Sequence, residues 1–135
     1  MIGILIIAHE PVASSFAKAV THVLGQTPVQ LDWLDVANDA PPDEIVKTAQ
    51  TRIDAIDSGD GVLVCTDVCG ATPCNISTRL DRPGKVHVLT GLNLPMLLRA
   101  INYRHAPLSE VTEKALDGAK TGVMQMERGD AAKED

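Results

Sequence analysis

Four short apolar segments predict the strands of a sheet. They occupy residues 2–8, 29–36, 61–66 and 86–90. The first is apolar throughout and stops at His9, a pattern typical of a strand that is buried on both faces. The second alternates only in part between apolar and polar positions. Between and after these segments the apolar period lengthens, which predicts helices.

These intervening segments predict five helices. The spacing places them from residue 12 to Gly25, from Pro41 and Pro42 to Gly59, from Pro73 to Gly84, over 94–101, and from Ser109 to about Gly122. The apolar stripes of the first, second and fourth are Val12, Phe16, Val20, Val23 and Leu24; Ile45, Ala49, Ile53 and Ile56; and Leu94, Leu97, Leu98 and Ile101. Glycine is expected to end the first three, because it adopts the left-handed C-cap conformation without strain.

Strands that alternate with amphipathic helices predict an α/β fold with parallel, right-handed crossovers. We expect a doubly wound, mainly parallel sheet of four or five strands in the order 2-1-3-4, with helices on both faces, as in a flavodoxin-like three-layer sandwich. Residues 123–126 are read either as a short final strand or as a helix end, and the charged residues 127–135 as a loose tail. One domain is therefore expected over residues 1–122, followed by a C-terminal segment over 123–135.

Composition narrows the function classes. The chain has 135 residues, 44% of them apolar but only 2% aromatic, and a net charge of −6. Few rings and no positive field argue against nucleic-acid binding and against a nucleotide-binding flavodoxin-like module. The apolar N-terminus lacks the basic flank and the length of a signal peptide, so we expect a cytoplasmic protein. Three crowded cysteines suit reduced thiols.

Two polar residues, His9 and Asp67, follow the first and third predicted strands. In a sheet of order 2-1-3-4 these strands are neighbours, and their carboxyl ends meet where such folds bind ligands. An aspartate that accepts a hydrogen bond from one imidazole nitrogen fixes the tautomer and leaves the other nitrogen free for nucleophilic attack. The pair therefore predicts a nucleophilic histidine, although each residue alone is more often structural.

The loop after the third predicted strand has features of an anion site. Gly70 permits a tight backbone, Thr72 is a candidate N-cap and Pro73 suits the first helical position. Backbone amides would then face the crevice. No lysine follows the glycine and no G-x-G-x-x-G is present, so the loop is not a nucleotide-binding loop of either common type. The cysteine spacings also lack the pairing of metal ligands, and we expect neither a metal nor a cofactor.

Three motifs together resemble one protein family. They are His9 after the first strand, D-x-x-G-A-T-P-x-N over residues 67–75, and G-x-N-x-P-M-L over residues 91–97. In this order and spacing, across about residues 1–122, they resemble the mannose-family (mannose, fructose, sorbose) IIA component of the bacterial phosphoenolpyruvate-dependent sugar phosphotransferase system.

The resemblance implies a phosphotransferase component whose His9 accepts a phosphoryl group from an HPr-like phosphocarrier and passes it to a IIB component. It further implies that Asp67 orients His9, that Gly70, Ala71 and Thr72 lie near the phosphoryl group, and that Asn93, Pro95 and Met96 shape the rim of the site. Homodimers are usual in the family, sometimes with an exchanged C-terminal strand, for which residues 123–126 are the candidate. The membrane permease would be reached only through protein partners, and no nucleic-acid partner is expected.

Three departures from the family pattern keep alternatives open. Glu10 stands where glycine is common, Ala71 replaces a frequent second glycine, and Cys69 stands where an aromatic residue is frequent in sugar-transporting members. Glu10 adds negative charge beside the incoming phosphate, which would slow transfer or select another donor surface. A stand-alone regulatory module that reports its phosphorylation state to a protein partner is the main alternative. Oxidation of Cys69 would obstruct the site, a further hypothesis. The related subunit of dihydroxyacetone kinase lacks the T-P-x-N ending found here.

Overall fold

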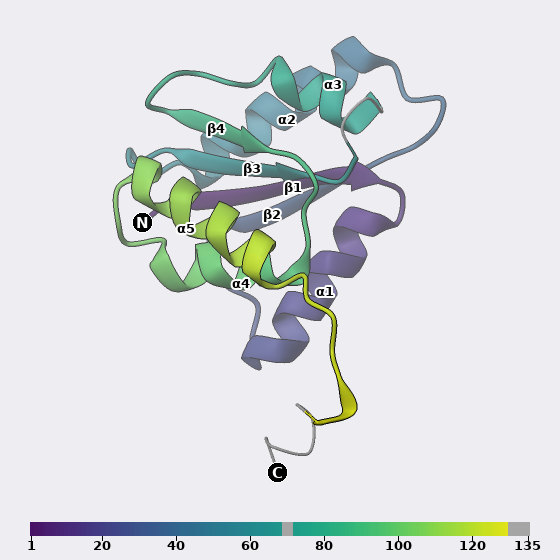
Figure 1. Cartoon of the computed structure of the whole chain (residues 1–135). Helices are drawn as coiled ribbons and strands as arrows, with labels where there is room; N and C mark the ends of the chain where they lie inside the picture. The colour runs from purple at the N-terminus through teal and green to yellow at the C-terminus, as the bar shows by residue number, and fades with distance from the viewer. Residues whose placement is uncertain (69–71, 130–135) are drawn as a thin grey trace.

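The four apolar segments form one parallel sheet. In the computed structural model, which describes residues 1–68 and 72–129, the strands are β1 (Gly3–His9), β2 (Leu31–Val36), β3 (Val62–Thr66) and β4 (Val86–Leu89). Within those residues the sheet has four strands in the order β2-β1-β3-β4, and every neighbouring pair is parallel. The predicted order 2-1-3-4 is confirmed, and it places β1 between β2 and β3 (Figure 1).

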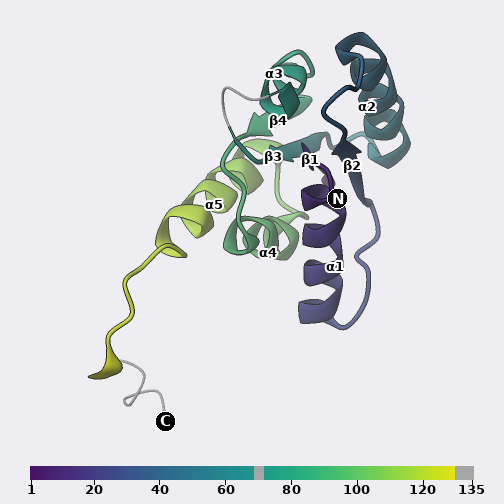
Figure 2. The same cartoon turned by 90° about the vertical axis from the view of Figure 1, so that its right-hand side faces the viewer.

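Five helices in the described residues cover the sheet on both faces, which confirms the three-layer α/β fold. They are α1 (Val12–Leu24), α2 (Pro42–Ile56), α3 (Thr72–Thr78), α4 (Leu94–Tyr103) and α5 (Leu108–Thr121). Helices α1, α4 and α5 lie on one face of the sheet, and α2 and α3 lie on the other (Figures 1 and 2).

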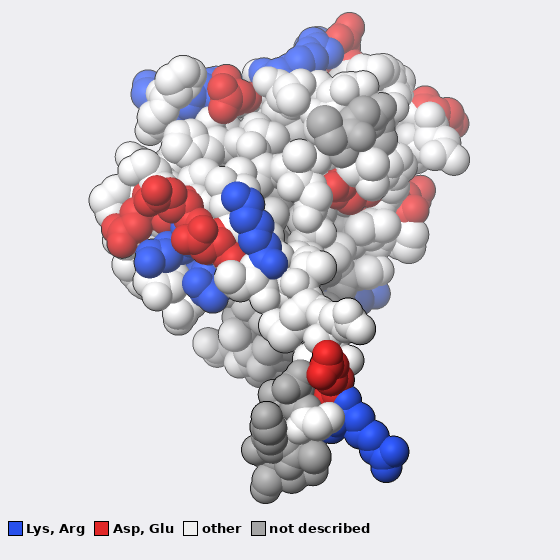
Figure 3. All heavy atoms as spheres, viewed as in Figure 1, with Lys and Arg blue, Asp and Glu red and all other residues white. Residues whose placement is uncertain are grey.

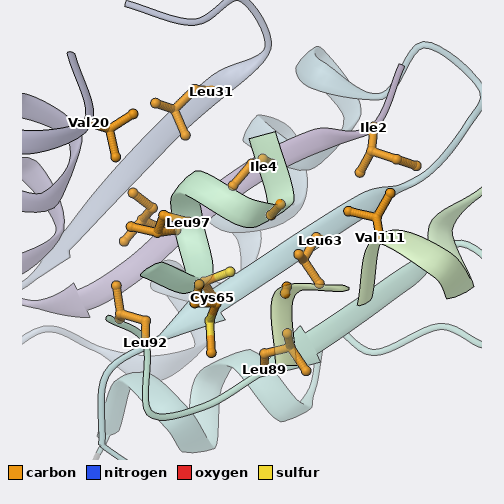
Figure 4. Close-up of a cluster of buried hydrophobic side chains, with 14 of the residues drawn as sticks. Ile2, Ile4, Val20, Leu31, Leu63, Cys65, Leu89, Leu92, Leu97 and Val111 are labelled. Carbon is orange, nitrogen blue, oxygen red and sulfur yellow. The ribbon is translucent and has the colours of Figure 1, made fainter. Parts of the chain in front are cut away.

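Alternate residues of β1 feed two separate cores. Ile4 and Ile6 pack with α1, α4 and α5, whereas Leu5 and Ile7 pack with α2 and α3. All four are completely buried, because helices cover both faces of the central strand. Figure 4 shows the first of these cores, with Leu97 of α4 among its labelled side chains. Because helices cover both faces of β1, its last residue, His9, is held in place at the carboxyl end of the strand.

Several predicted helix ends are wrong by a few residues. The second helix ends at Ile56, before Gly59, because the Asp57 carboxylate accepts hydrogen bonds from the amides of Gly59 (2.8 Å) and Gly61 (3.1 Å). These local bonds replace the next helical turn.

The third helix ends at Thr78, well before Gly84, because residues 82–86 form a tight turn in which Arg82 and Val86 exchange backbone hydrogen bonds (2.9 Å each). The fifth helix begins at Leu108, and the Pro107 carbonyl already accepts from Glu110 and Val111, so Ser109 does not cap it.

Two apolar residues assigned to the buried stripe of the first helix lie at the surface. Val23 is 54% exposed and Leu24 is 44% exposed, because the last turn of α1 extends beyond the sheet. Residues 123–127 carry neither helix nor strand, and Val123, Met124 and Met126 are exposed. No helix within the described residues has the length and apolar character needed to span a membrane.

Candidate functional site

The carboxyl ends of β1 and β3 bring His9 and Asp67 into direct contact. The Nδ1 atom of His9 lies 2.8 Å from Oδ2 of Asp67, and the backbone amide of His9 donates to the same oxygen at 3.1 Å. Both contacts follow from the parallel pairing of β1 with β3, which places residues 58 positions apart at one edge of the sheet. The predicted pairing of the two side chains is therefore present in the structure.

Asp67 is held as a carboxylate. Burial raises its pKa, but hydrogen bonds from the His9 ring, the Val68 amide and the His9 amide lower it, and the net result lies below the ordinary value of 3.8. The Val68 amide donates to Oδ1 at 2.8 Å, so both carboxylate oxygens are engaged. With its side chain only 13% exposed, Asp67 has few alternative orientations. It therefore acts as a fixed acceptor for the imidazole.

This acceptor determines the tautomer of neutral His9. A carboxylate can only accept, so Nδ1 carries the proton and Nε2 keeps its lone pair. Within residues 1–68 and 72–129, no hydrogen bond reaches Nε2, and the His9 side chain is 40% exposed. An oriented, partly exposed imidazole whose second nitrogen keeps its lone pair can attack an electrophilic group presented by another molecule.

The backbone next to Asp67 is tied to the loop after β4. The Gly91 amide donates to the Asp67 carbonyl at 2.7 Å, and the Leu92 amide donates to the Thr66 carbonyl at 3.0 Å. Gly91 has a φ of +74°, a conformation that favours glycine. Its place at the start of the third motif was the sequence signal for this role, which sequence reasoning missed.

Part of the predicted phosphoryl-binding loop falls outside the described residues. Gly70 and Ala71 are in this group, as is Cys69. Thr72 is described: it is exposed and begins α3, a helix of seven residues. Placement of this loop around an anion stays a prediction.

The three predicted rim residues have contacts at the start of α4, and the rim role of the partly exposed Asn93 and Pro95 stays a prediction. Asn93 caps α4, where its Oδ1 accepts from the Met96 amide at 2.9 Å and its Nδ2 donates to the Ala119 carbonyl of α5 at 3.1 Å. Met96 is only 1% exposed and belongs to the core, so its side chain does not lie on an open rim. Pro95 is half-buried against α5, where an added Cβ at Gly122 would lie 2.4 Å from the proline ring. Together they hold the start of α4 against α5.

The surface beside His9 also holds an apolar hollow that sequence reasoning missed. It measures about 270 Å³ and is lined by Pro11, Val12, Ser15, Phe16, Ala19 and Leu94. The only sequence signal was the single phenylalanine of the chain, one turn into the helix that follows His9. In the same described part, no group of three or more histidine, cysteine or acidic side chains is arranged to hold a metal ion.

Comparison with known proteins adds a family to this geometry. A family model described as "PTS system fructose IIA component" matches residues 3–116. Among solved structures, the phosphotransferase system component EIIA of Streptococcus agalactiae aligns with a TM-score of 0.82 at 24% identity, over 93% of this chain and 97% of that one. The mannose/sorbose-specific IIA subunit of Enterococcus faecalis aligns with a TM-score of 0.81 at 16% identity, over 93% and 95% of the two chains. A sigma-54 interaction domain protein of Enterococcus faecalis aligns with a TM-score of 0.73 at 15% identity, over 89% and 91%. At these identities the structures share the fold.

Proposed function

The chain belongs to the family of phosphotransferase-system fructose IIA components, and from that membership we propose that it is a phosphohistidine carrier. His9 accepts a phosphoryl group from an HPr-like phosphocarrier and passes it to a IIB component. The observation that carries the proposal is the 2.8 Å contact between His9 Nδ1 and Asp67, which leaves Nε2 as the nucleophile. In this role the protein is a cytoplasmic phosphotransferase component that reaches a membrane permease only through other proteins.

The transfer follows from the protonation state of the pair. The Nε2 lone pair attacks the phosphorus atom of the donor's phosphohistidine, and the donor P–N bond breaks. The electron pair of that bond stays on the donor imidazole. Since Nε2 carries no proton, none has to leave His9. The phosphorylated ring keeps its Nδ1 proton and gains positive character, which the Asp67 carboxylate stabilises. Attack by the IIB nucleophile on the same phosphorus reverses these changes.

A labelling experiment tests the proposal. Wild type, His9→Ala and His22→Ala are incubated with phosphoenolpyruvate, Enzyme I and HPr, and acid-labile, base-stable phosphate is measured. His22 is the matched control because it is an exposed histidine of α1 outside the pair. Label on wild type and His22→Ala, with none on His9→Ala, supports the proposal. Absence of label on wild type, or full label on His9→Ala, contradicts it.

The second candidate is a regulatory phosphoacceptor that signals through a protein partner without sugar transport. The fold similarity to a sigma-54 interaction domain protein supports this regulatory candidate. The two candidates differ in the fate of the label. A transport component loses its phosphate to an added IIB protein, whereas a regulatory module retains it and changes its affinity for the partner. A chase with purified IIB therefore separates them.

We also propose a homodimer. Support comes from the exposed apolar side chains at the C-terminal end of the described chain, Val123 (75%), Met124 (65%) and Met126 (56%). These side chains offer an apolar surface against which a second copy of the chain can pack. In addition, β4 is an edge strand, and its outer side offers a place for a strand from another copy. Light scattering of wild type and of Met124→Asp tests this, since a dimer held by the segment dissociates in the variant.

A further inference from the structure

The apolar hollow beside His9 lies between the first turns of two helices. Val12 and Phe16 come from α1 and Leu94 from α4, and all three are partly buried against the core. Figure 2 shows α1 and α4 side by side beneath the sheet. The hollow starts at Pro11, two residues beyond His9, so it adjoins the carboxyl ends of the strands. A side chain that fills it would therefore lie at the same edge of the sheet as His9.

The size and lining of the hollow suit a protein side chain. Apart from Ser15, the residues around its 270 Å³ are apolar. Small-molecule sites usually contain several convergent polar groups that fix the ligand, whereas Ser15 is the one polar residue in this lining. A shallow apolar depression at a reactive site instead fits a protruding apolar residue of a macromolecular partner.

The same edge of the molecule is acidic. The loops that follow the four strands carry Glu10, Asp39 and Asp67, and in sequence they contain no lysine or arginine. Figure 3 shows acidic side chains along the right-hand edge of the view, the side toward which the strands of Figure 1 point. The Glu10 amide donates to the Val36 carbonyl at 3.1 Å, which anchors this residue at the strand ends while its side chain stays exposed.

Two basic residues outside these loops, Arg79 and Lys18, lie in other surroundings. Arg79 pairs with Asp43 at 3.1 Å, beside α2 on the opposite face of the sheet. Lys18 of α1 lines a different groove, together with Trp33. A phosphoryl group that approaches His9 is itself an anion, so the carboxylates of Glu10 and Asp67 repel it unless the donor supplies positive charge.

We propose that the hollow and Glu10 form a single docking surface for a phosphocarrier protein. This partner inserts an apolar side chain between α1 and α4 and places a cationic side chain opposite Glu10. The inference rests on the proposed function and deepens it, because it states what the donor must present. Glu10 selects among donors by charge, and Phe16 and its neighbours position the donor's phosphohistidine before Nε2 of His9.

Kinetics of transfer from phospho-HPr to His9 test the docking surface. Ser15→Glu puts a charge into the hollow at an exposed position. The control, Ser109→Glu, makes the same substitution at an exposed position of α5, at the opposite edge of the sheet. Ser15→Glu is expected to raise KM at least about tenfold with little change in kcat, since it prevents burial of an apolar side chain. Ser109→Glu is expected to keep the wild-type KM. A wild-type KM for Ser15→Glu overturns the proposal.

Glu10→Gln separates attraction of a basic donor from repulsion of phosphate. The variant is expected to raise KM several-fold at low ionic strength, with the difference lost at about 0.5 M salt, where charges are screened within a few ångströms. A lower KM or a faster transfer in Glu10→Gln overturns the proposal, because Glu10 then only repels the phosphoryl group.

Two further measurements distinguish a failure of the docking proposal from a failure of the proposed function. Phosphoramidate, a small phosphodonor, is expected to label wild type and Ser15→Glu at equal rates, because it does not dock. If neither it nor phospho-HPr labels wild type, the proposed function fails before docking is in question. Light scattering is expected to give the same mass for wild type and Ser15→Glu. A loss of mass in the variant makes the hollow a contact between copies of this chain and overturns the assignment to a phosphocarrier.

Discussion

Asp67→Asn is the most informative single substitution at the site. The carboxylate accepts three hydrogen bonds, from His9 Nδ1 (2.8 Å), the His9 amide (3.1 Å) and the Val68 amide (2.8 Å). An amide of the same shape has one accepting oxygen and one donating nitrogen. If that oxygen stays with the Val68 amide, the NH₂ group faces His9, and the ring must carry its proton on Nε2 to accept it. The nucleophilic nitrogen is then blocked.

The opposite orientation of the amide is also costly. It keeps the contact to the His9 ring, but it sets an NH₂ group against the Val68 amide and removes the negative charge that stabilises the phosphorylated ring. In either orientation at least one hydrogen bond to a charged group is lost, worth about 1.5–3 kcal/mol. Because the side chain of His9 is 40% exposed, solvent screens part of the charge effect. The rate of phosphoryl transfer is therefore expected to fall about 10–150-fold.

Single-turnover quenched flow with labelled phospho-HPr measures this rate, and ³¹P–¹⁵N NMR assigns the phosphate to Nε2 or Nδ1. Urea unfolding of both proteins controls for loss of structure, and Asp81→Asn, at an exposed position between α3 and β4, is the matched control. A rate for Asp67→Asn within twofold of wild type would refute the role assigned to the pair. Phosphate on Nδ1 of the wild-type protein would refute it independently, since that atom contacts Asp67.

Further substitutions test the scaffold and the protonation states. In Gly118→Ala the new Cβ would lie 2.7 Å from Arg99 Cβ, so urea unfolding should show a loss of about 1–3 kcal/mol, whereas Gly129→Ala, with no atom within 4 Å, should be neutral. Asn93→Ala should cost about 1–2 kcal/mol in the same assay, because it removes the cap of α4 and the bond to α5. Burial raises the pKa of the Cys65 thiol to about 12, so peptide mapping after maleimide treatment at pH 8 should show Cys65 unlabelled until the protein is unfolded. The pKa of Asp67 is lowered in the folded protein, so the stability that its carboxylate contributes is complete above about pH 4. This contribution is lost as the pH falls through the pKa of Asp67 in the folded state. The difference in unfolding free energy between wild type and Asp67→Asn should therefore shrink between about pH 6 and pH 3.

The sequence predicted the features that depend on burial along the backbone. The run before His9 is apolar at every side chain, and in the structure its residues alternate between two cores, as a central parallel strand must. Once the strand order 2-1-3-4 was expected, the contact of His9 with Asp67 followed from topology, and it is present at 2.8 Å. The strand order determines which strand ends lie side by side, and many residues specify that order together.

Features that depend on a single side chain were predicted less well. Helix ends moved because Asp57 and the turn at 82–86 offer local hydrogen bonds that compete with a further helical turn. Met96 was assigned to the rim from its place in a motif, yet its side chain fills the core. A motif records which residues occur together, whereas burial and hydrogen bonding decide whether a side chain faces solvent or the interior.

Two acidic neighbours of His9 have different roles: Asp67 orients the imidazole, and Glu10 lies on the surface that a donor would meet. Asp67 is held by hydrogen bonds from the backbone amides of His9 and Val68, so its effect on Nε2 is independent of what docks. Glu10 and the hollow of α1 and α4 lie at the surface and have no contact with Nδ1 of His9, so they can change without altering the tautomer. Nucleophilicity therefore comes from the rigid strand ends, and donor choice comes from the exposed residues just beyond them. Substitutions at Asp67 should accordingly lower kcat for every donor, whereas substitutions at Ser15 and Glu10 should change KM for protein donors.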